Sequence, residues 1–298
     1  MKPVLLIHGG AGSAIPRSRS ERIRGHLRRI CDEAYAHLAS QSAVEMVVQT
    51  VARLEDHPLF NAGTGSVLQR DGVARMSASV MDGSRHRFAG VLNIERVRHP
   101  VHVAQLLLEE DDRVLSGAGA TRFARQHGLP VWDPVTPARR RQWLRRQPAF
   151  RATGYRRGRG AGRRDQDRYD TVSAVALDGI GRLAAATSTG GKGFERIGRV
   201  SDSGLPPGNF ADARVAVACT GLGEEILEEG LAVRLAQRVH DGLTLARAFA
   251  LTFRELRERH RRVAAIGVDD QGRWAWAATV PALFAVGRIA ARCRVESF

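Results

Sequence analysis

The chain has 298 residues, of which 43% are hydrophobic and 26% charged, the balance of a globular protein with ample length for a core. It contains no stretch near the roughly 20 apolar residues of a membrane helix and no secretory signal pattern at its start, so we expect a cytoplasmic protein without a membrane partner. The three cysteines are too widely spaced to predict a disulfide framework or a CxxC metal pair.

The first half of the chain predicts alternating strands and helices. Residues 3–8 indicate a buried strand that ends in the glycine turn 9–12, and two helical patterns fill 21–54. Ser42 and Glu45 form a capping-box pattern at the start of the second helix. Further predicted elements are a loop from residue 58, a two-stranded hairpin that turns at Asp71 and Gly72, a strand at 88–94 and a helix at 100–126.

Most of the net charge of +15 comes from one segment of the first half. Twelve arginines lie between residues 139 and 168, together with Trp143, Phe150 and Tyr155. Arginines interleaved with aromatic residues occur in nucleic-acid binders, so a basic binding protein is one interpretation. The prolines and glycines of the segment instead favour a mobile surface linker over about 133–170, and nucleic acid is the less favoured partner.

Regular structure is predicted again from Thr171 onwards. Two apolar strands, 171–178 and 182–189, are joined by a turn at Asp178 and Gly179. Because such hairpins join neighbouring strands in both halves, we expect α/β layers on a largely antiparallel sheet. The remaining predicted elements are a strand at 214–219, a helix after the glycine loop at 220–223, a helix at 244–259 and a hairpin of 262–268 with 273–279.

The sharp boundary before Thr171 indicates a chemical role for this residue. If the peptide bond between Asp170 and Thr171 is cleaved, Thr171 has a free α-amine beside its own hydroxyl. An α-amine has a pKa of about 8 and can accept the hydroxyl proton, so one residue supplies both nucleophile and base. The alternative is that Thr171 is an ordinary β-branched strand residue, and the residue alone does not decide between the two.

Seven motifs in the chain decide in favour of the nucleophile. They are LLIHGGAG (5–12), LEDHPLFNAGTGSVLQRDG (54–72), ASVMDG (78–83), DTVSAVALD (170–178), AATSTGG (185–191), GRVSDS (198–203) and CTGLGEE (219–225). In content and order they resemble the plant-type L-asparaginase and isoaspartyl peptidase family of N-terminal nucleophile hydrolases. The resemblance covers nearly the whole chain except the arginine-rich segment and the C-terminal tail.

The resemblance implies a four-layer αββα sandwich with two central, mainly antiparallel sheets. It also implies a precursor that cleaves itself between Asp170 and Thr171. The products, an α subunit (1–170) and a β subunit (171–298), would remain one folded domain and pair as a homodimer of αβ units. The implied reaction is hydrolysis of L-asparagine and β-aspartyl dipeptides, whose aspartyl parts are identical, so the residue types do not rank one above the other.

The resemblance also implies site residues, all of which bind or react with a small substrate. Thr171 is the nucleophile, Thr189 orients its hydroxyl, and Asn61 assists beside it. Arg199 would pair with the substrate α-carboxylate through two bonds, as a planar guanidinium can. Asp202 and the Gly223 carbonyl would hold the α-ammonium, while Thr220 and Gly221 form the oxyanion hole. No cofactor is implied in catalysis, but a structural sodium ion is implied on the backbone carbonyls of Leu54, Glu55, Phe60, Ala62 and Thr64.

Other interpretations of these motifs are weaker. Arg199 and Asp202 alone would be a surface ion pair, and the glycines at 221 and 223 a generic helix start. His8 with its following glycines is similar to an esterase oxyanion segment, but the chain has no GxSxG nucleophile motif. Asp170 also precedes the nucleophile in glycosylasparaginases, which makes a hydrolase of N4-substituted asparagine the alternative enzyme. A shortened loop at 203–212 departs from the family pattern at the rim of the expected pocket.

Overall fold

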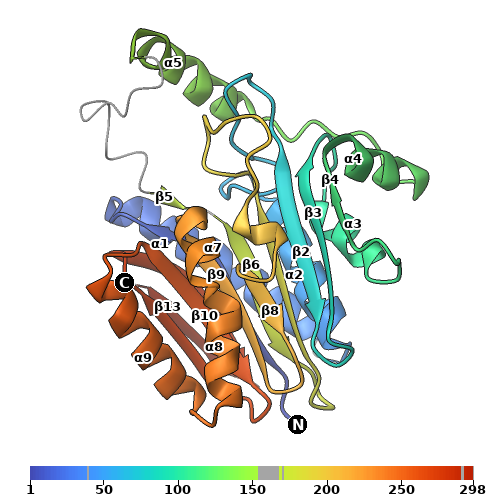
Figure 1. The fold of residues 1–298 in the computed structure, drawn as a ribbon, viewed down its shortest axis with the longest axis vertical. Helices are drawn as coiled ribbons and strands as arrows, with labels where there is room; N and C mark the ends of the chain where they lie inside the picture. Colours follow the sequence, from blue (N-terminus) through green and yellow to red (C-terminus); the bar gives the residue numbers. More distant parts are fainter. Residues whose placement is uncertain (39, 154–167, 170, 290–291, 298) are drawn as a thin grey trace.

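Two β-sheets lie face to face, with helices on both outer sides, in a computed structural model (Figure 1). The structure describes residues 1–38, 40–153, 168–169, 171–289 and 292–297. This arrangement confirms the expected four-layer αββα sandwich. Within the described chain, the larger sheet has, in spatial order, β13 (Arg292–Ser297), β12 (Ala282–Ile289), β1 (Val4–Gly12), β6 (Val172–Leu177), β7 (Leu183–Thr189), β2 (Met76–Asp82), β3 (Arg87–Ile94) and β4 (Val114–Ser116), and β5 (Arg168–Tyr169) also pairs with β1.

The pairing in both sheets is antiparallel except between β3 and β4, which are parallel. The mainly antiparallel sheet predicted from the hairpins is therefore confirmed. The smaller sheet has the order β11 (Trp274–Ala278), β10 (Val263–Asp269), β9 (Val215–Gly221) and β8 (Asn209–Ala211).

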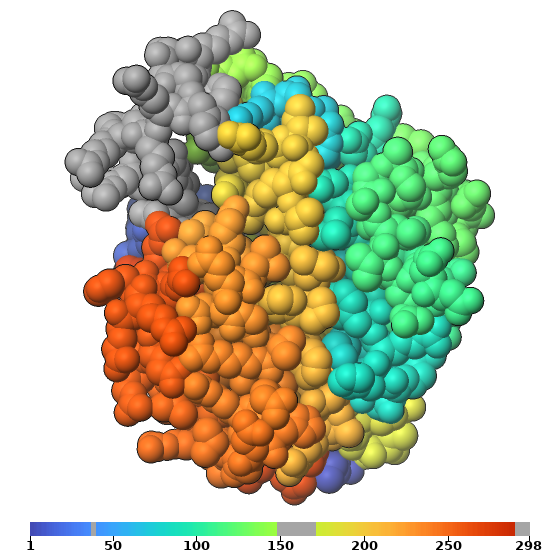
Figure 2. All heavy atoms as spheres, viewed as in Figure 1, coloured from blue at the N-terminus to red at the C-terminus, as the bar shows by residue number. Residues whose placement is uncertain are grey.

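The helices divide between the two outer layers. Those that cover the larger sheet are α1 (Arg17–Leu38), α2 (Ala43–Glu55), α3 (Pro100–Leu107) and α4 (Gly117–Gln126). The smaller sheet is covered by α8 (Leu231–His240) and α9 (Leu245–Glu258), which form the orange surface in Figure 2, and α7 (Gly223–Glu229) precedes them. The capping box at the start of α2 is present, with the Ser42 hydroxyl and the Glu45 carboxylate each bonded to the other's backbone N–H.

The first four residues of strand β1, 4–7, are all apolar because both faces of the strand are buried. Leu5 and Ile7 belong to the core under α1 and α2, whereas Val4 and Leu6 belong to the core between the two sheets. Successive side chains of a strand point to opposite faces, and both faces of this strand are buried. A third core lies between the smaller sheet and helices α8 and α9.

Two local predictions in the first half are wrong. The expected helix at 100–126 is divided, because residues 114–116 pair with the edge of β3 and Gly117 has a φ of 53°. The expected hairpin strand before Asp71 is absent from the described structure, where residues 56–75 form a loop before β2. The N–H of Val67 in this loop bonds to the Asn61 side chain rather than to a neighbouring strand.

The arginine-rich segment also differs from prediction. Residues Pro137–Thr153 form helix α5 where a mobile linker is expected, and 154–167 lie outside the described residues. The Trp143 indole N–H donates to the Gln69 carbonyl at 2.9 Å, and its ring stacks on Phe194 at 6.2 Å between centroids. The Arg139 guanidinium donates to the Gly65 carbonyl at 2.6 Å. These contacts attach α5 to the body of the protein through a few side chains, which a periodicity analysis does not detect.

Candidate active site

Thr171 lies directly before β6, in the middle of the larger sheet, and the residue is 8% exposed. Its hydroxyl donates to the Thr189 hydroxyl on neighbouring strand β7 at 3.3 Å. The Thr189 oxygen also accepts from the Gly191 N–H at 3.2 Å, so it is held from both sides. The antiparallel pairing of β6 with β7 thus brings together two threonines 18 residues apart. Asp170, on the other side of the expected cleavage site, lies outside the described residues.

His8 is a buried neighbour of Thr171 whose role the sequence did not predict. It lies on β1 beside β6, and its Nδ1 is 3.1 Å from the Thr171 carbonyl oxygen. Since a carbonyl oxygen only accepts, Nδ1 is the nitrogen that carries the proton. Burial lowers the pKa of His8 to about 4, so the imidazole is neutral at physiological pH. The glycine-flanked position of His8 gave no signal for this contact, which depends on strand pairing.

A pocket opens beside the Thr171 hydroxyl and gathers most of the predicted site. Six of the residues predicted from sequence line it, namely Thr171, Thr189, Arg199, Asp202, Gly221 and Gly223. Four residues without a predicted role complete the lining, namely Gly191, Lys192, Ser201 and Leu222. Thr220 is fully buried at the end of β9, directly before this lining.

Arg199 is held in a fixed orientation at one wall of the pocket. Its Nε and Nη2 donate to the two carboxylate oxygens of Glu224 at 3.0 and 3.2 Å. Lys192 donates to the same carboxylate at 2.6 Å. Hydrogen bonds from these two cations, Arg199 foremost, lower the pKa of Glu224 to about 2 despite its partial burial. Glu224 therefore stays charged and fixes one edge of the guanidinium, which leaves the Nη1 side for a ligand.

Asp202 is buried beside Arg199, and its two carboxylate oxygens differ in their hydrogen bonds. Ser201 donates to its Oδ1 at 3.3 Å, whereas Oδ2 has no hydrogen-bond partner among the described residues. Burial raises the pKa of Asp202 to about 6, although the nearby Arg199 charge opposes this shift. A Cβ added to Gly208 would lie 2.8 Å from Oδ2, so the shortened loop packs directly on this carboxylate. A buried, unsatisfied carboxylate oxygen costs free energy unless a cationic ligand binds it.

Two glycines, one at the end of β9 and one at the start of α7, leave space that no other residue would leave. A Cβ at Gly223 would lie 2.4 Å from Asp202 Oδ1 and 2.6 Å from Arg199 Nη2. Gly221 has a φ of 134°, and a Cβ there would lie 2.5 Å from the Arg262 carbonyl oxygen. These contacts explain the G-x-G spacing by close backbone approach.

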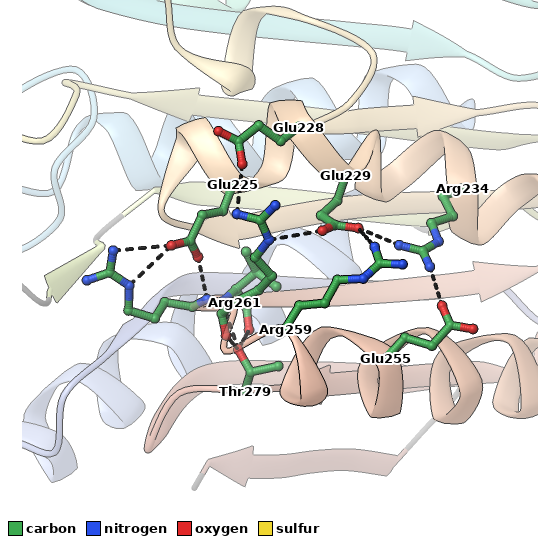
Figure 3. Close-up of polar contacts among 10 residues, drawn as sticks. Glu225, Glu228, Glu229, Arg234, Glu255, Arg259, Arg261 and Thr279 are labelled. Atoms are coloured by element: carbon green, nitrogen blue, oxygen red, sulfur yellow. Dashed lines mark hydrogen bonds and ion pairs between the residues drawn. The ribbon is translucent and has the colours of Figure 1, made fainter.

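A network of ion pairs fixes the helix that follows these glycines (Figure 3). The nearly buried Glu229, at the end of α7, binds Arg234, Arg259 and Arg261. Glu225, in the first half of α7, accepts from the Arg262 backbone N–H and guanidinium. The same Arg262 carbonyl receives the Leu222 N–H at 2.9 Å. The network thus connects the pocket end of α7 to the segment between α9 and β10.

Asn61, like Thr220, is a predicted catalytic residue that does not line this pocket. Its side-chain amide donates to the Gly191 carbonyl at 2.6 Å, and its oxygen accepts from the Val67 N–H at 2.8 Å. Its backbone carbonyl accepts from the Gly190 N–H at 2.8 Å. Asn61 therefore connects the loop that follows α2 to the glycine turn that follows Thr189. Thr189 is the residue that bonds to the nucleophile.

The loop expected to hold sodium has oxygens that are already partly used. The Glu55 carbonyl accepts from the Thr64 N–H at 2.7 Å, and the Phe60 carbonyl accepts from the positively charged Arg139 at 3.5 Å. A guanidinium on one proposed ligand disfavours a second cation beside it. Among the described residues, no group of three or more His, Cys, Asp or Glu side chains could hold a metal ion.

None of the described helices is long and apolar enough to span a membrane.

Comparisons with known proteins agree with the motifs. A family model described as asparaginase matches residues 1–292. The chain is 45% identical to an isoaspartyl peptidase/L-asparaginase of Synechocystis over 96% of this chain and 87% of that protein. It is 35% identical to a plant-type L-asparaginase of Pyrococcus abyssi over 90% of each chain. It is 34% identical to the human isoaspartyl peptidase/L-asparaginase over 94% of this chain and 91% of that one.

Proposed function

Because this chain belongs to the asparaginase family, we propose that it is a self-activating amidohydrolase that releases L-aspartate from L-asparagine and β-aspartyl dipeptides. The observation that carries this proposal is the pocket in which the Thr171 hydroxyl, held by Thr189, faces a paired guanidinium and a buried carboxylate. A ligand with adjacent carboxylate and ammonium groups fits that pair of opposite charges.

Activation would proceed by cleavage between Asp170 and Thr171, leaving subunits 1–170 and 171–298. The new α-amine of Thr171 has an ordinary pKa of about 8 and accepts the proton of its own hydroxyl. The hydrogen bond to Thr189 limits the rotation of that hydroxyl. The neutral His8 holds the Thr171 carbonyl, which fixes the backbone of the nucleophile without adding a charge near it.

The aspartyl part of the substrate would bind opposite the nucleophile. Arg199, fixed by Glu224, receives the α-carboxylate, while Asp202 and the Gly223 carbonyl receive the α-ammonium. The free Oδ2 of Asp202 is the acceptor that this ammonium would satisfy. Because these residues bind the α-carboxylate and α-ammonium that both substrate types share, they select the aspartyl moiety and not the leaving group.

Chemistry follows from this placement. The Thr171 Oγ1 attacks the side-chain amide carbon, and the oxyanion binds at Thr220 and Gly221, where one lost donor costs about a hundredfold or more. The C–N bond breaks, and ammonia or an amino acid leaves with the proton taken from the hydroxyl. Water then attacks the threonyl ester, which releases L-aspartate and restores the Thr171 hydroxyl. Asn61 acts in this scheme by holding the glycine turn after Thr189.

The assembly, the location, the sodium site and the nucleic-acid alternative are separate from the catalytic chemistry. A homodimer of αβ units and a cytoplasmic location remain predictions. No step is routed through a sodium ion, because Arg139 already contacts one of its proposed ligands. The nucleic-acid alternative loses one of its three aromatic residues, since Trp143 packs inward on Phe194.

A pair of variants tests the proposal. Purified wild-type protein should release ammonia from L-asparagine and leucine from β-aspartyl-leucine, and Thr171→Ala should release neither. Thr171→Ser keeps the hydroxyl and should retain part of the activity. Full activity in Thr171→Ala would contradict the mechanism. Hydrolysis of N4-(N-acetylglucosaminyl)-asparagine in preference to both other substrates would favour the glycosylasparaginase alternative.

A further inference from the structure

A second cavity adjoins the proposed active site, on the side away from the aspartyl anchors. Gly191 and Lys192 line both spaces. Arg199, Asp202 and Gly223 line the first space but not the second. With the open mouth of each included, the second space measures about 1070 Å³ and the first about 310 Å³. It therefore offers room for a group larger than ammonia.

A short chain of hydrogen bonds connects the nucleophile to a residue that lines this cavity. Thr171 bonds to Thr189, Thr189 to the Gly191 N–H, and the Gly191 carbonyl to Asn61, which lines the second cavity. Once the aspartyl part of a substrate is fixed at Arg199 and Asp202, the amide nitrogen and its substituent must extend away from those anchors. The shared wall at Gly191 and Lys192 leads from the nucleophile into the second cavity.

The lining of the second cavity is strongly basic. Its described charged residues are Arg19 from α1, Arg139 and Arg146 from α5, and Lys192 from the glycine turn, and none of its described lining residues is acidic. Arg146 is fixed over the Phe194 ring at 4.9 Å, which holds its charge at the cavity edge. Lys192 already pairs with Glu224, so Arg19, Arg139 and Arg146 are the cations by which this polar, half-enclosed space attracts anionic groups.

We propose that this cavity is a leaving-group subsite that selects β-aspartyl dipeptides whose second residue is acidic. The inference rests on the proposed function, because it assigns the side of that active site which the aspartyl anchors do not occupy. Every amino acid released from a β-aspartyl dipeptide carries an α-carboxylate, and glutamate or aspartate carries a second carboxylate on its side chain. L-Asparagine, whose leaving group is ammonia, makes no contact with the subsite. Helix α5 is thereby part of the substrate site rather than an expendable connection to the cleavage point.

The test compares substrates within one enzyme preparation. The value of kcat/KM is measured for β-aspartyl-glutamate, β-aspartyl-leucine, β-aspartyl-lysine and L-asparagine. Because the fraction of matured enzyme cancels in a ratio of two substrates, a variant that folds or matures poorly still gives an interpretable result. We expect wild-type protein to prefer glutamate over leucine and leucine over lysine, and this preference to shrink as sodium chloride is raised from about 20 to about 500 mM.

Arg146→Gln should lower the glutamate-to-lysine ratio about two- to fivefold, the range of a partly exposed ion pair, with the leucine-to-asparagine ratio moving less. Arg145→Gln, an exposed neighbour on α5 outside the lining, removes the same charge and should leave the ratio unchanged. Equal ratios in the two variants, or a wild-type preference for lysine, would overturn the subsite while L-asparagine hydrolysis persists. If wild-type protein hydrolyses none of the four substrates, the proposed function itself is overturned.

Discussion

The two sides of Thr171 are built differently. On the aspartyl side, Arg199 and Asp202 are mostly buried, paired or hydrogen-bonded, and pressed against glycine backbone. On the opposite side, the cavity is wide, open and basic, and a helix attached by a few side chains forms part of its wall. A tight side fixes a group that every substrate shares, whereas an open side accepts groups that vary. Substitutions on the first should therefore affect all substrates, and substitutions on the second only some.

Gly223→Ala should have the largest effect. Its methyl group would lie 2.4 Å from Asp202 Oδ1 and 2.6 Å from Arg199 Nη2, so both anchors must move. Displacing bound groups by about an ångström can cost about a hundredfold, and we expect kcat/KM to fall by at least that factor for L-asparagine and β-aspartyl-leucine alike. Gly119→Ala is the matched control, because a Cβ there meets nothing within 4 Å. A loss confined to one substrate would contradict a role of both anchors in binding every substrate.

Asp202 should set part of the pH dependence. Its carboxyl must be ionised to hold an ammonium, and burial raises its pKa to about 6 in the free enzyme. The value of kcat/KM should therefore fall as the pH drops through 6, with the Thr171 amine adding a second decrease from about pH 8 downwards. Asp202→Asn should remove the component near pH 6 and lower kcat/KM about ten- to a hundredfold at pH 7.5. An unchanged acid limb in the variant would exclude Asp202 from the titration.

The same carboxyl affects stability with a definite sign. Its folded pKa is raised above the ordinary value of 3.8, so folding favours the protonated form. Its contribution to stability is complete below about pH 4 and is lost as the pH rises towards 6. Asp202→Asn should therefore be as stable as wild type, or more stable, at neutral pH in urea unfolding.

Glu229→Gln should separate stability from selectivity. The carboxylate binds three arginines and is nearly buried, whereas the arginines are partly exposed. We expect a loss of about 1–2 kcal/mol in the free energy of unfolding, below the cost of breaking a fully buried pair. The glutamate-to-lysine and leucine-to-asparagine ratios should stay at wild-type values, because the network acts on α7 as a whole. A changed substrate ratio would show that α7 takes part in selectivity.

Among the substitutions at the aspartyl side of the pocket, Glu224→Gln should have the smallest effect on catalysis. The amide keeps the shape of the side chain and one acceptor for Arg199, but it loses the charge that pairs with Arg199 and Lys192. A less firmly fixed guanidinium binds the α-carboxylate more weakly, so KM for L-asparagine should rise about three- to tenfold with kcat little changed. A fall in kcat with constant KM would instead indicate a role in the transition state.

The aspartyl side was largely predictable from sequence, and the opposite side was not. Gly221, Gly223, Arg199 and Asp202 lie in short motifs whose spacing reflects close backbone approach, and such constraints are visible as residue types. Glu224 also lies in a motif, CTGLGEE, but its bond to Arg199 depends on how the loop after β7 meets α7.

Helix α5 was missed for a physical reason. Its sequence has many arginines and no apolar period, so nothing in it predicts a buried face. It is held instead by Trp143 and Arg139, whose partners lie 74 residues earlier in the chain, at Gln69 and Gly65. His8 was missed likewise, because its contact with Thr171 arises from strand pairing across 163 residues.

The most direct test of the account is the covalent state of the working enzyme. Intact-mass measurement of purified, active protein, with N-terminal sequencing of the smaller chain, locates any break to one peptide bond. The account predicts chains 1–170 and 171–298, the second beginning Thr-Val-Ser-Ala-Val, and a rate of hydrolysis that rises in step with the cleaved fraction. A fully active preparation in which the bond between Asp170 and Thr171 is intact would contradict it.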